Sequence, residues 1–174
     1  MGPRSQAQPR GRAEPVEAEM PLGRYLASTE KRVRDRAIRS LAAFVLMRAQ
    51  EGGLSMSPAE LSKLWKGLFY CFWMSDKPLV QQQLAQELSE LVLMVAGIDT
   101  RSDEAQVASL RHALAALDFY QGFWHTMQAE WLGVDKFRID KYYLLMRRFL
   151  QAGCQLLLVY GCDALLVERY VHIM

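Results

Sequence analysis

The chain has 174 residues, of which 51% are hydrophobic, and a formal net charge of +2 at pH 7. A chain of this length fits one domain with its own core, since domains commonly run to about 100–200 residues. The nearly neutral charge does not indicate nucleic-acid binding by bulk charge, and no stretch approaches the ~18 uninterrupted apolar residues that a membrane span requires.

Residues 1–20 are expected to form a disordered tail. They hold Gly, Pro, Arg and Gln and contain no apolar segment of the kind found in a signal peptide. After Pro21 only Pro58 and Pro78 remain, both at predicted helix starts, and the apolar residues recur at helical spacing. Residues 21–174 are therefore predicted to form one all-α domain.

The first helical unit begins near Leu22, turns at residues 28–30 and continues as a helix to about Gln50, followed by Gly52 and Gly53. One face of this helix is predicted to be apolar and consists of Val33, Ala37, Leu41 and Phe44. Roughly opposite lie three arginines within a narrow arc: Arg32, Arg36 and Arg39.

The second helix has an explicit start at Ser57. This residue is a capping serine, proline occupies the first helical position, and a glutamate stands three residues after the cap. The predicted apolar stripe consists of Leu61, Leu64, Trp65, Leu68 and Phe72, and the other face holds Lys63, Lys66 and Tyr70. A break at residues 75–78 precedes a third helix, which Gly97 ends.

Further helices are predicted over residues 104–131 and 135–160, with a short last helix ending at Met174. The apolar face of the 135–160 helix holds Tyr142, Leu145, Met146 and Phe149. Helices of about 15–25 residues with short turns favour stacked antiparallel pairs. The predicted fold is an irregular α-solenoid, or α–α superhelix, of HEAT-like helix pairs; an ordinary helical bundle is the alternative.

The sequence contains no recognisable catalytic or cofactor motif. It has three histidines without an H-E-x-x-H pattern, and it lacks a P-loop, a G-x-G-x-x-G cradle and a G-x-S-x-G elbow. The three cysteines form no C-x-x-C pair and are expected to be reduced core residues. We therefore assign no catalytic, cofactor-binding or metal-binding residue and expect no enzyme activity.

Two aromatic blocks supply candidate contact residues. Residues 64–73 are interpreted mainly as core, with Tyr70 and Trp73 as exceptions. In residues 135–148, basic side chains are predicted to share one narrow face, which together with the earlier arginines forms a basic strip for RNA phosphate or an acidic protein. A solvated face with internal ion pairs is the equal alternative. The candidate partner or RNA-binding residues are Arg32, Arg36, Arg39, Lys66, Tyr70, Trp73, Arg138, Lys141 and Arg148.

Several strings occur in an order that resembles the eukaryotic nucleolar family called ribosomal RNA processing protein 1, which is Nop52-like. The most distinctive are Trp65-Lys66-Gly67-Leu68-Phe69-Tyr70-Cys71 and Arg138-Ile139-Asp140-Lys141-Tyr142-Tyr143. Others are Leu26 to Lys31 with Val33 to Ala37, and Phe123 to Met127 followed by Glu130-Trp131. Together the matches extend over about residues 22–150.

The resemblance implies a nuclear, nucleolar, non-catalytic scaffold in the processing of rRNA for the large (60S) ribosomal subunit, within the pre-ribosome. Its expected partners are other large-subunit assembly factors and, as an alternative function, pre-rRNA bound directly. Neither a membrane nor a small-molecule substrate is expected. A helical-repeat adaptor unrelated to ribosomes is the alternative from another class. Family members usually continue into more helices and a charged tail, so the chain is expected to be a fragment, a short product or a reduced form.

Overall fold

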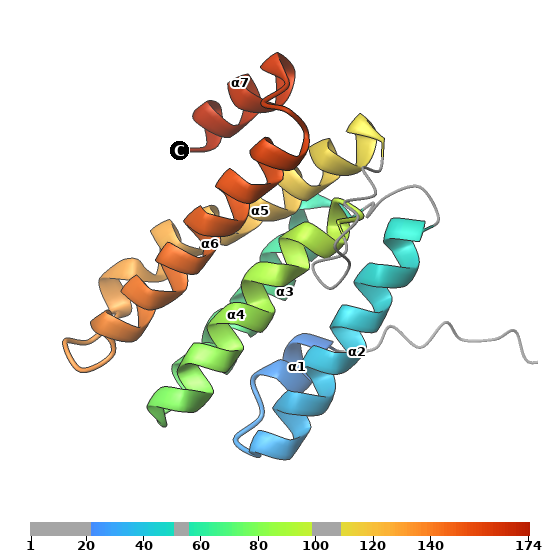
Figure 1. Ribbon diagram of the computed structural model, residues 1–174. Coiled ribbons are helices and arrows are strands. Elements are labelled where there is room, and N and C mark those ends of the chain that lie inside the picture. Colours follow the sequence, from blue (N-terminus) through green and yellow to red (C-terminus); the bar gives the residue numbers. More distant parts are fainter. Residues whose placement is uncertain (1–21, 51–55, 99–108) are drawn as a thin grey trace, which may run out of the picture.

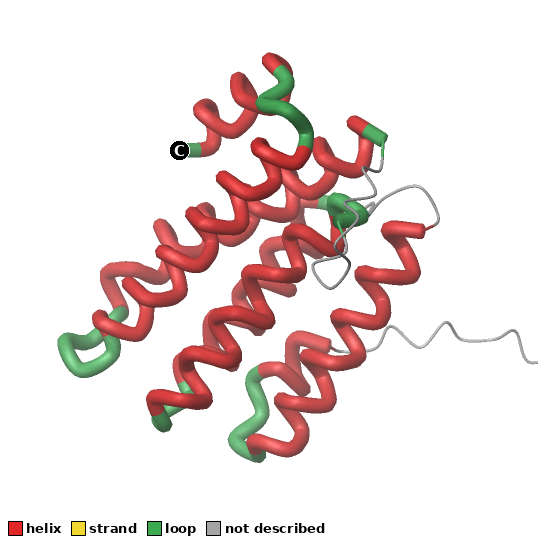
Figure 2. Tube along the Cα trace, in the orientation of Figure 1, coloured by secondary structure: helices red, strands yellow, loops and turns green. Residues whose placement is uncertain are grey.

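The computed structural model describes residues 22–50, 56–98 and 109–174, and these residues form helices joined by turns, without a strand (Figures 1 and 2). The elements are α1 (Leu22–Leu26), α2 (Lys31–Gln50), α3 (Pro58–Trp73), α4 (Pro78–Val95), α5 (Leu110–Glu130), the 3-10 turn η1 (Trp131–Gly133), α6 (Ile139–Val159) and α7 (Ala164–Ile173). The all-α class is confirmed. The predicted tail lies outside the described residues. None of the described helices combines the length and the apolar character needed to cross a bilayer.

The helices are arranged in two layers. Helices α1, α3 and α5 pack in sequence in one layer, with α7 against α5, and α2, α4 and α6 pack in sequence in the other. Figure 1 shows α2, α4 and α6 side by side, with the first layer behind them. Each helix therefore contacts its neighbours along the array. This arrangement confirms the predicted helical-repeat solenoid and not the alternative, an ordinary helical bundle.

Local signals mark the helix ends as predicted. The Ser57 side chain accepts a hydrogen bond from the Glu60 backbone N–H at 3.3 Å, and the Glu60 carboxylate accepts one from the Ser57 N–H at 2.7 Å. Gly97, just beyond α4, has a φ of 71°, which a side chain would disfavour. The predicted start of the 135–160 helix is wrong by four residues, because residues 135–138 close a turn before α6 begins.

The core is centred on aromatic rings from α3, α5 and α6. The Trp65 ring lies 4.7 Å from Phe119 and 5.4 Å from Phe149 between centroids, and its indole N–H donates to the Phe119 carbonyl at 2.9 Å. A buried indole satisfied in this way gives the core one fixed arrangement. On α2 the predicted inward face is only partly right, since Phe44 is exposed and Ile38 is buried instead.

Candidate protein and RNA contact surface

Most of the aromatic block on α3 belongs to the core. Leu64, Leu68 and Phe72 are buried, and Phe69 stacks on Tyr142 with ring centroids 4.7 Å apart. The Tyr142 hydroxyl donates to the Phe69 carbonyl at 3.0 Å, and burial raises the pKa of this tyrosine. The interpretation of the block as core is therefore confirmed, and its aromatic rings pack α3 against α6.

Two candidate residues of α3 lie on the surface and share a carboxylate on α5. The Tyr70 hydroxyl donates to Glu130 Oε2 at 3.0 Å, and Lys66 Nζ lies 3.0 Å from Glu130 Oε1. The hydrogen bonds to Glu130 raise the pKa of both Tyr70 and Lys66. This surface triad of Lys66, Tyr70 and Glu130 links α3 to α5 and presents a charged edge beside an exposed aromatic ring.

Trp73 and Arg138 form a second aromatic and basic contact. The Arg138 guanidinium lies over the half-buried Trp73 ring, 4.5 Å from its centroid, and pairs with Asp135 in the preceding turn. Burial acts to raise the pKa of Asp135, but hydrogen bonds from Arg138 and from the Phe137 N–H outweigh it and hold the pKa below its usual value. Arg138 is thus occupied by two partners, and its Nε is buried without a hydrogen-bond partner among the described residues.

The structure corrects the predicted position of Lys141. This side chain does not project from the surface with Arg138 and Arg148; it is 6% exposed. Its Nζ donates to the carbonyls of Trp73 at 2.6 Å and Ser75 at 2.9 Å. Burial lowers the pKa of Lys141 to about 8, against the opposing charge of Asp76. Lys141 therefore ties α6 to the end of α3 and is not available to a partner.

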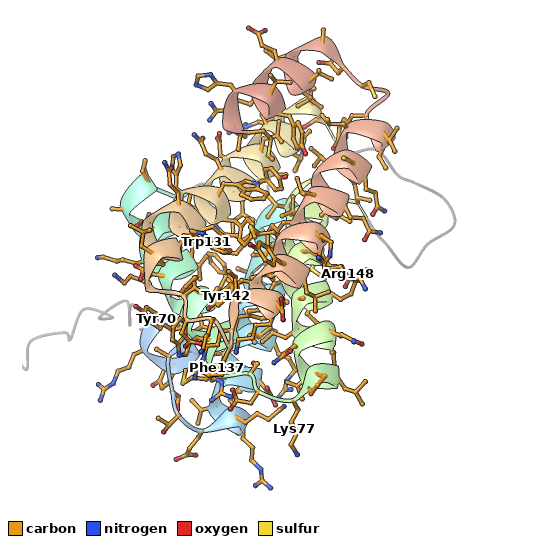
Figure 3. The ribbon with its side chains drawn as sticks, turned by 90° about the vertical axis from the view of Figure 1, so that its left-hand side faces the viewer. Tyr70, Lys77, Trp131, Phe137, Tyr142 and Arg148 are labelled. Carbon is orange, nitrogen blue, oxygen red and sulfur yellow. The ribbon has the colours of Figure 1, made fainter. Side chains whose placement is uncertain are left out.

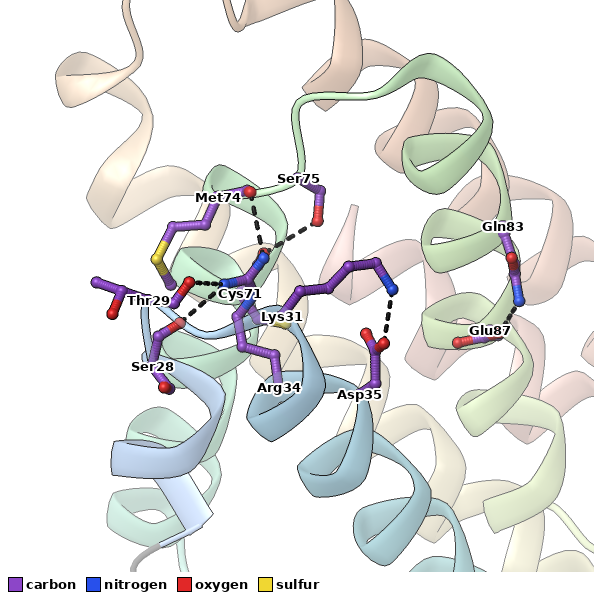
Figure 4. Close-up of polar contacts among 10 residues, drawn as sticks. All are labelled: Ser28, Thr29, Lys31, Arg34, Asp35, Cys71, Met74, Ser75, Gln83 and Glu87. Carbon is purple, nitrogen blue, oxygen red and sulfur yellow. Dashed lines mark hydrogen bonds and ion pairs between the residues drawn. The ribbon is translucent and has the colours of Figure 1, made fainter.

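A buried arginine that sequence reasoning missed completes this end of α3. Arg34 is 7% exposed, and its Nη1 donates to the carbonyls of Ser28 and Thr29, each at 2.9 Å. Its Nη2 donates to Met74 O at 3.3 Å, as Figure 4 shows. One signal could have identified it: Arg34 stands four residues before the buried Ile38 and so shares its face. The Val33-Arg34-Asp35-Arg36-Ala37 string therefore has a structural role.

The predicted basic strip does not form as one surface. Arg32, Arg36 and Arg39 are exposed on α2, whereas Arg148 is partly exposed on α6 and bonds Gln151 at 3.2 Å. Helix α4 packs between α2 and α6 and carries two glutamates and no basic residue. Figure 3 places Arg148 on the other side of the view from Tyr70, with Tyr142 between them. The candidate residues thus fall into separate surfaces.

Two open grooves lie between helices of the same layer. The groove between α2 and α4, about 440 Å³ in volume, is lined by charges of both signs, including Asp35, Arg39, Glu87 and Glu90. The groove between α3 and α5, about 800 Å³ in volume, is lined in part by Lys66 and Glu130. Beyond them, Leu132 is 98% and Phe137 85% exposed around η1, so the α5–α6 turn carries apolar groups on the surface.

The cysteines differ from the expectation that all three belong to the core. Cys71 is buried, and burial raises the pKa of its thiol to about 11. Cys154 and Cys162 are exposed. Cys154 lies on the solvent-exposed side of α6 near its end, and Cys162 lies in the turn after this helix.

In the part of the chain that the structure describes, no three His, Cys, Asp or Glu side chains gather as metal ligands would.

Comparison with known proteins identifies relatives along most of the chain. The family described as "Nucleolar protein, Nop52" matches residues 17–174. Human ribosomal RNA processing protein 1 homolog A is 36% identical over 156 residues, which is 90% of this chain and 31% of that protein. The mouse homolog B is 42% identical over 140 residues, 80% of this chain and 17% of its own. The Drosophila melanogaster homolog is 32% identical over 136 residues, 78% and 18% respectively. The chain thus spans less than a third of the length of these relatives.

Proposed function

The chain belongs to the Nop52 family of nucleolar proteins, and on that premise we propose that it acts in rRNA processing as a non-catalytic scaffold. Its relatives are named ribosomal RNA processing protein 1 homologs, which supports that process. In this proposal the chain works in the nucleolus, within precursors of the large ribosomal subunit, and holds other assembly-factor proteins in position.

The observation that carries the proposal is the side-by-side stacking of α1, α3 and α5 and of α2, α4 and α6. A solenoid of this kind offers extended surfaces to several partners at once. Hydrogen bonds from Arg34 of α2 and Lys141 of α6 fix the end of α3 to the other layer, so the two layers keep a constant separation there. A rigid support of this kind suits a protein that positions others.

The proposed protein-docking surface is the α3–α5 side of the domain. It contains the surface triad of Lys66, Tyr70 and Glu130, in which Lys66 and Glu130 line the open groove and Tyr70 bonds Glu130. Tyrosine next to a groove is a common anchor in protein interfaces, because it combines a large apolar ring with a polar tip. The exposed Phe137 at the α5–α6 turn adds apolar surface to the same layer end.

The test is affinity purification of the tagged chain from nuclear extract, with and without nuclease. We expect large-subunit assembly factors to be enriched with precursor rRNA, and the proteins to stay bound after nuclease. The double variant Lys66→Ala/Tyr70→Ala should lose some of the bound assembly factors. The control is the double variant Lys63→Ala/Tyr25→Ala, which also removes one exposed lysine and one exposed tyrosine. It should retain all of the bound assembly factors.

Loss of all assembly factors after nuclease would contradict protein docking and indicate an RNA tether. A fluorescent fusion of the chain provides a second criterion. Accumulation in the nucleolus is expected, whereas exclusion from it, in a folded protein, would favour a helical-repeat adaptor outside ribosome assembly.

A further inference from the structure

Helix α2 concentrates positive charge. It contains six basic residues and one acidic residue. The whole chain has a net charge of only +2, so the remainder of the sequence is net negative. A local excess of this kind attracts a polyanion to one edge of the domain even when the total charge is small.

Two of the basic residues of α2 are already engaged. Lys31 pairs with Asp35 at 2.6 Å, and Arg34 is buried against backbone carbonyls. Three others form the exposed set that we call the arginine row: Arg32, Arg36 and Arg39. Within the described ranges, no ion pair joins the arginine row to an acid. These guanidinium groups are therefore available to an external anion.

The geometry of α2 places the arginine row in a line. At 100° per residue the three positions fall within an arc of about 60°, and they extend roughly 10 Å along the axis. The position that continues the arc is Ala43, which is small, so no large apolar side chain lies within the arc, and the exposed Met47 lies just outside it, one turn beyond Ala43. Glu87 and Glu90 of α4 line the groove on the Arg39 side, so an anion is favoured on the outer face of α2.

Resting on the proposed function, we propose that the arginine row binds the phosphate backbone of RNA. A guanidinium presents paired N–H donors that match phosphate oxygens. A protein partner of comparable affinity would need an apolar anchor near the centre of the contact, whereas the exposed Met47 lies beyond the C-terminal end of the row. Contacts to phosphate read no sequence, so the binding is expected to be weak, sequence-independent and sensitive to salt.

The test uses the purified full chain and a fluorescein-labelled oligouridylate of about 20 nucleotides, long enough to cover several phosphates. Fluorescence anisotropy gives the affinity at several KCl concentrations. Three phosphate contacts predict a slope of log K against log[salt] of about −2. The affinity of the wild-type chain should accordingly fall about 20-fold between ~50 and ~200 mM salt.

Three variants separate the row from charge in general. Replacing Arg32, Arg36 and Arg39 by Gln should weaken binding on the order of tenfold at low salt and bring the slope near zero. A matched control replaces Lys63, Lys77 and Arg147 by Gln, which removes the same charge from three exposed positions elsewhere, and should change the affinity by about twofold or less. Replacing the three arginines by Lys keeps the charge and should keep the slope.

Equal losses in the two Gln triples would overturn the proposal, because binding would then follow total charge. Undiminished binding by the Arg→Gln triple, or preference for a labelled polyglutamate peptide over the oligouridylate, would overturn it as well. Circular dichroism of each variant confirms the fold. The assay contains no cellular partner, so its failure leaves the nuclease-resistant pull-down, and with it the proposed scaffold function, standing on its own.

Discussion

Arg34 of α2 and Lys141 of α6 donate hydrogen bonds to consecutive carbonyls at the C-terminal end of α3. Arg34 Nη2 lies 3.3 Å from Met74 O, and Lys141 Nζ lies 2.6 Å from Trp73 O and 2.9 Å from Ser75 O. The last carbonyls of a helix have no partner within it and form the negative end of its dipole. Two buried cations from two other helices therefore satisfy this end and join the two layers.

Replacing Lys141 by Met should destabilise the domain. Methionine retains an apolar stem of similar length but leaves the Trp73 carbonyl without the Lys141 donor, whereas the Ser75 carbonyl keeps the hydrogen bond from Gln81 at 2.9 Å. We expect the free energy of unfolding in urea to fall by about 1–3 kcal/mol. The exposed Lys63 of α3 is the control, and Lys63→Met should change the free energy of unfolding by less than about 0.5 kcal/mol. Equal effects at the two positions would contradict the role given to Lys141.

The buried amine of Lys141 also predicts a pH dependence. Its pKa is lowered by burial to about 8 from the ordinary 10.5. Between these pH values the unfolded chain binds more protons at this residue than the folded chain does, so this residue's contribution to stability rises with pH. Below pH 8 Lys141 is protonated in both the folded and the unfolded chain. The full free-energy cost of burying the charged amine is then present and no longer changes with pH.

The readout is the difference in unfolding free energy between wild type and Lys141→Met at each pH. Taking the difference removes the opposite effect of Cys71, whose pKa burial raises to about 11. The wild type should gain about 1–3 kcal/mol relative to the variant as the pH rises from 8 to 10.5. A constant difference across this range would show that burial does not shift the pKa of Lys141.

The stability of the domain should depend on the shape of the side chain at position 34 as well as on its charge. Arg34→Met removes donors to Ser28, Thr29 and Met74, and we expect a loss of about 2–3 kcal/mol in the same urea measurement. Arg34→Lys keeps the charge but not the fork that reaches two segments, so it should recover only part of the loss. Arg36→Met, an exposed neighbour, should stay within about 0.5 kcal/mol of wild type. Full recovery by lysine would contradict the geometric argument.

The contrast between α3 and Lys141 explains how far the sequence alone could predict this structure. The capping box at Ser57 and the break before Pro78 depend on residues a few positions apart, so the pattern predicts them correctly. Helical periodicity does not report which distant carbonyls a long side chain reaches. It therefore misplaces Lys141, which bonds Trp73 and Ser75, and misses Arg34, which bonds Met74 as well as the turn before its own helix. The basic strip failed for the same reason: the pattern does not show that α4 lies between α2 and α6.

The thiols offer a simple check on the C-terminal part of the array. Cys154 and Cys162 are exposed, whereas Cys71 is buried with a raised pKa. With a thiol-reactive reagent at neutral pH, we expect Cys154 and Cys162 of the native chain to be modified within minutes. Cys71 should be modified only after denaturation, because the reaction requires an accessible thiolate. Peptide mapping assigns the sites. Rapid modification of native Cys71 would contradict the burial of this side of α3.

Gly122 of α5 tests the close approach of α5 and α3. A Cβ atom at this position would lie 2.5 Å from Cδ1 and 2.7 Å from Nε1 of Trp65. The indole cannot move aside easily, because it is buried and its N–H donates to the Phe119 carbonyl. Overpacking costs about 1–3 kcal/mol and so exceeds the gain of up to about 1 kcal/mol in helix propensity. Gly122→Ala should therefore lower the melting temperature and alter tryptophan fluorescence. At Gly133 nothing lies within 4 Å of an added Cβ, so Gly133→Ala should leave both signals unchanged, and a similar change in the two variants would mean that Trp65 does not pack on Gly122.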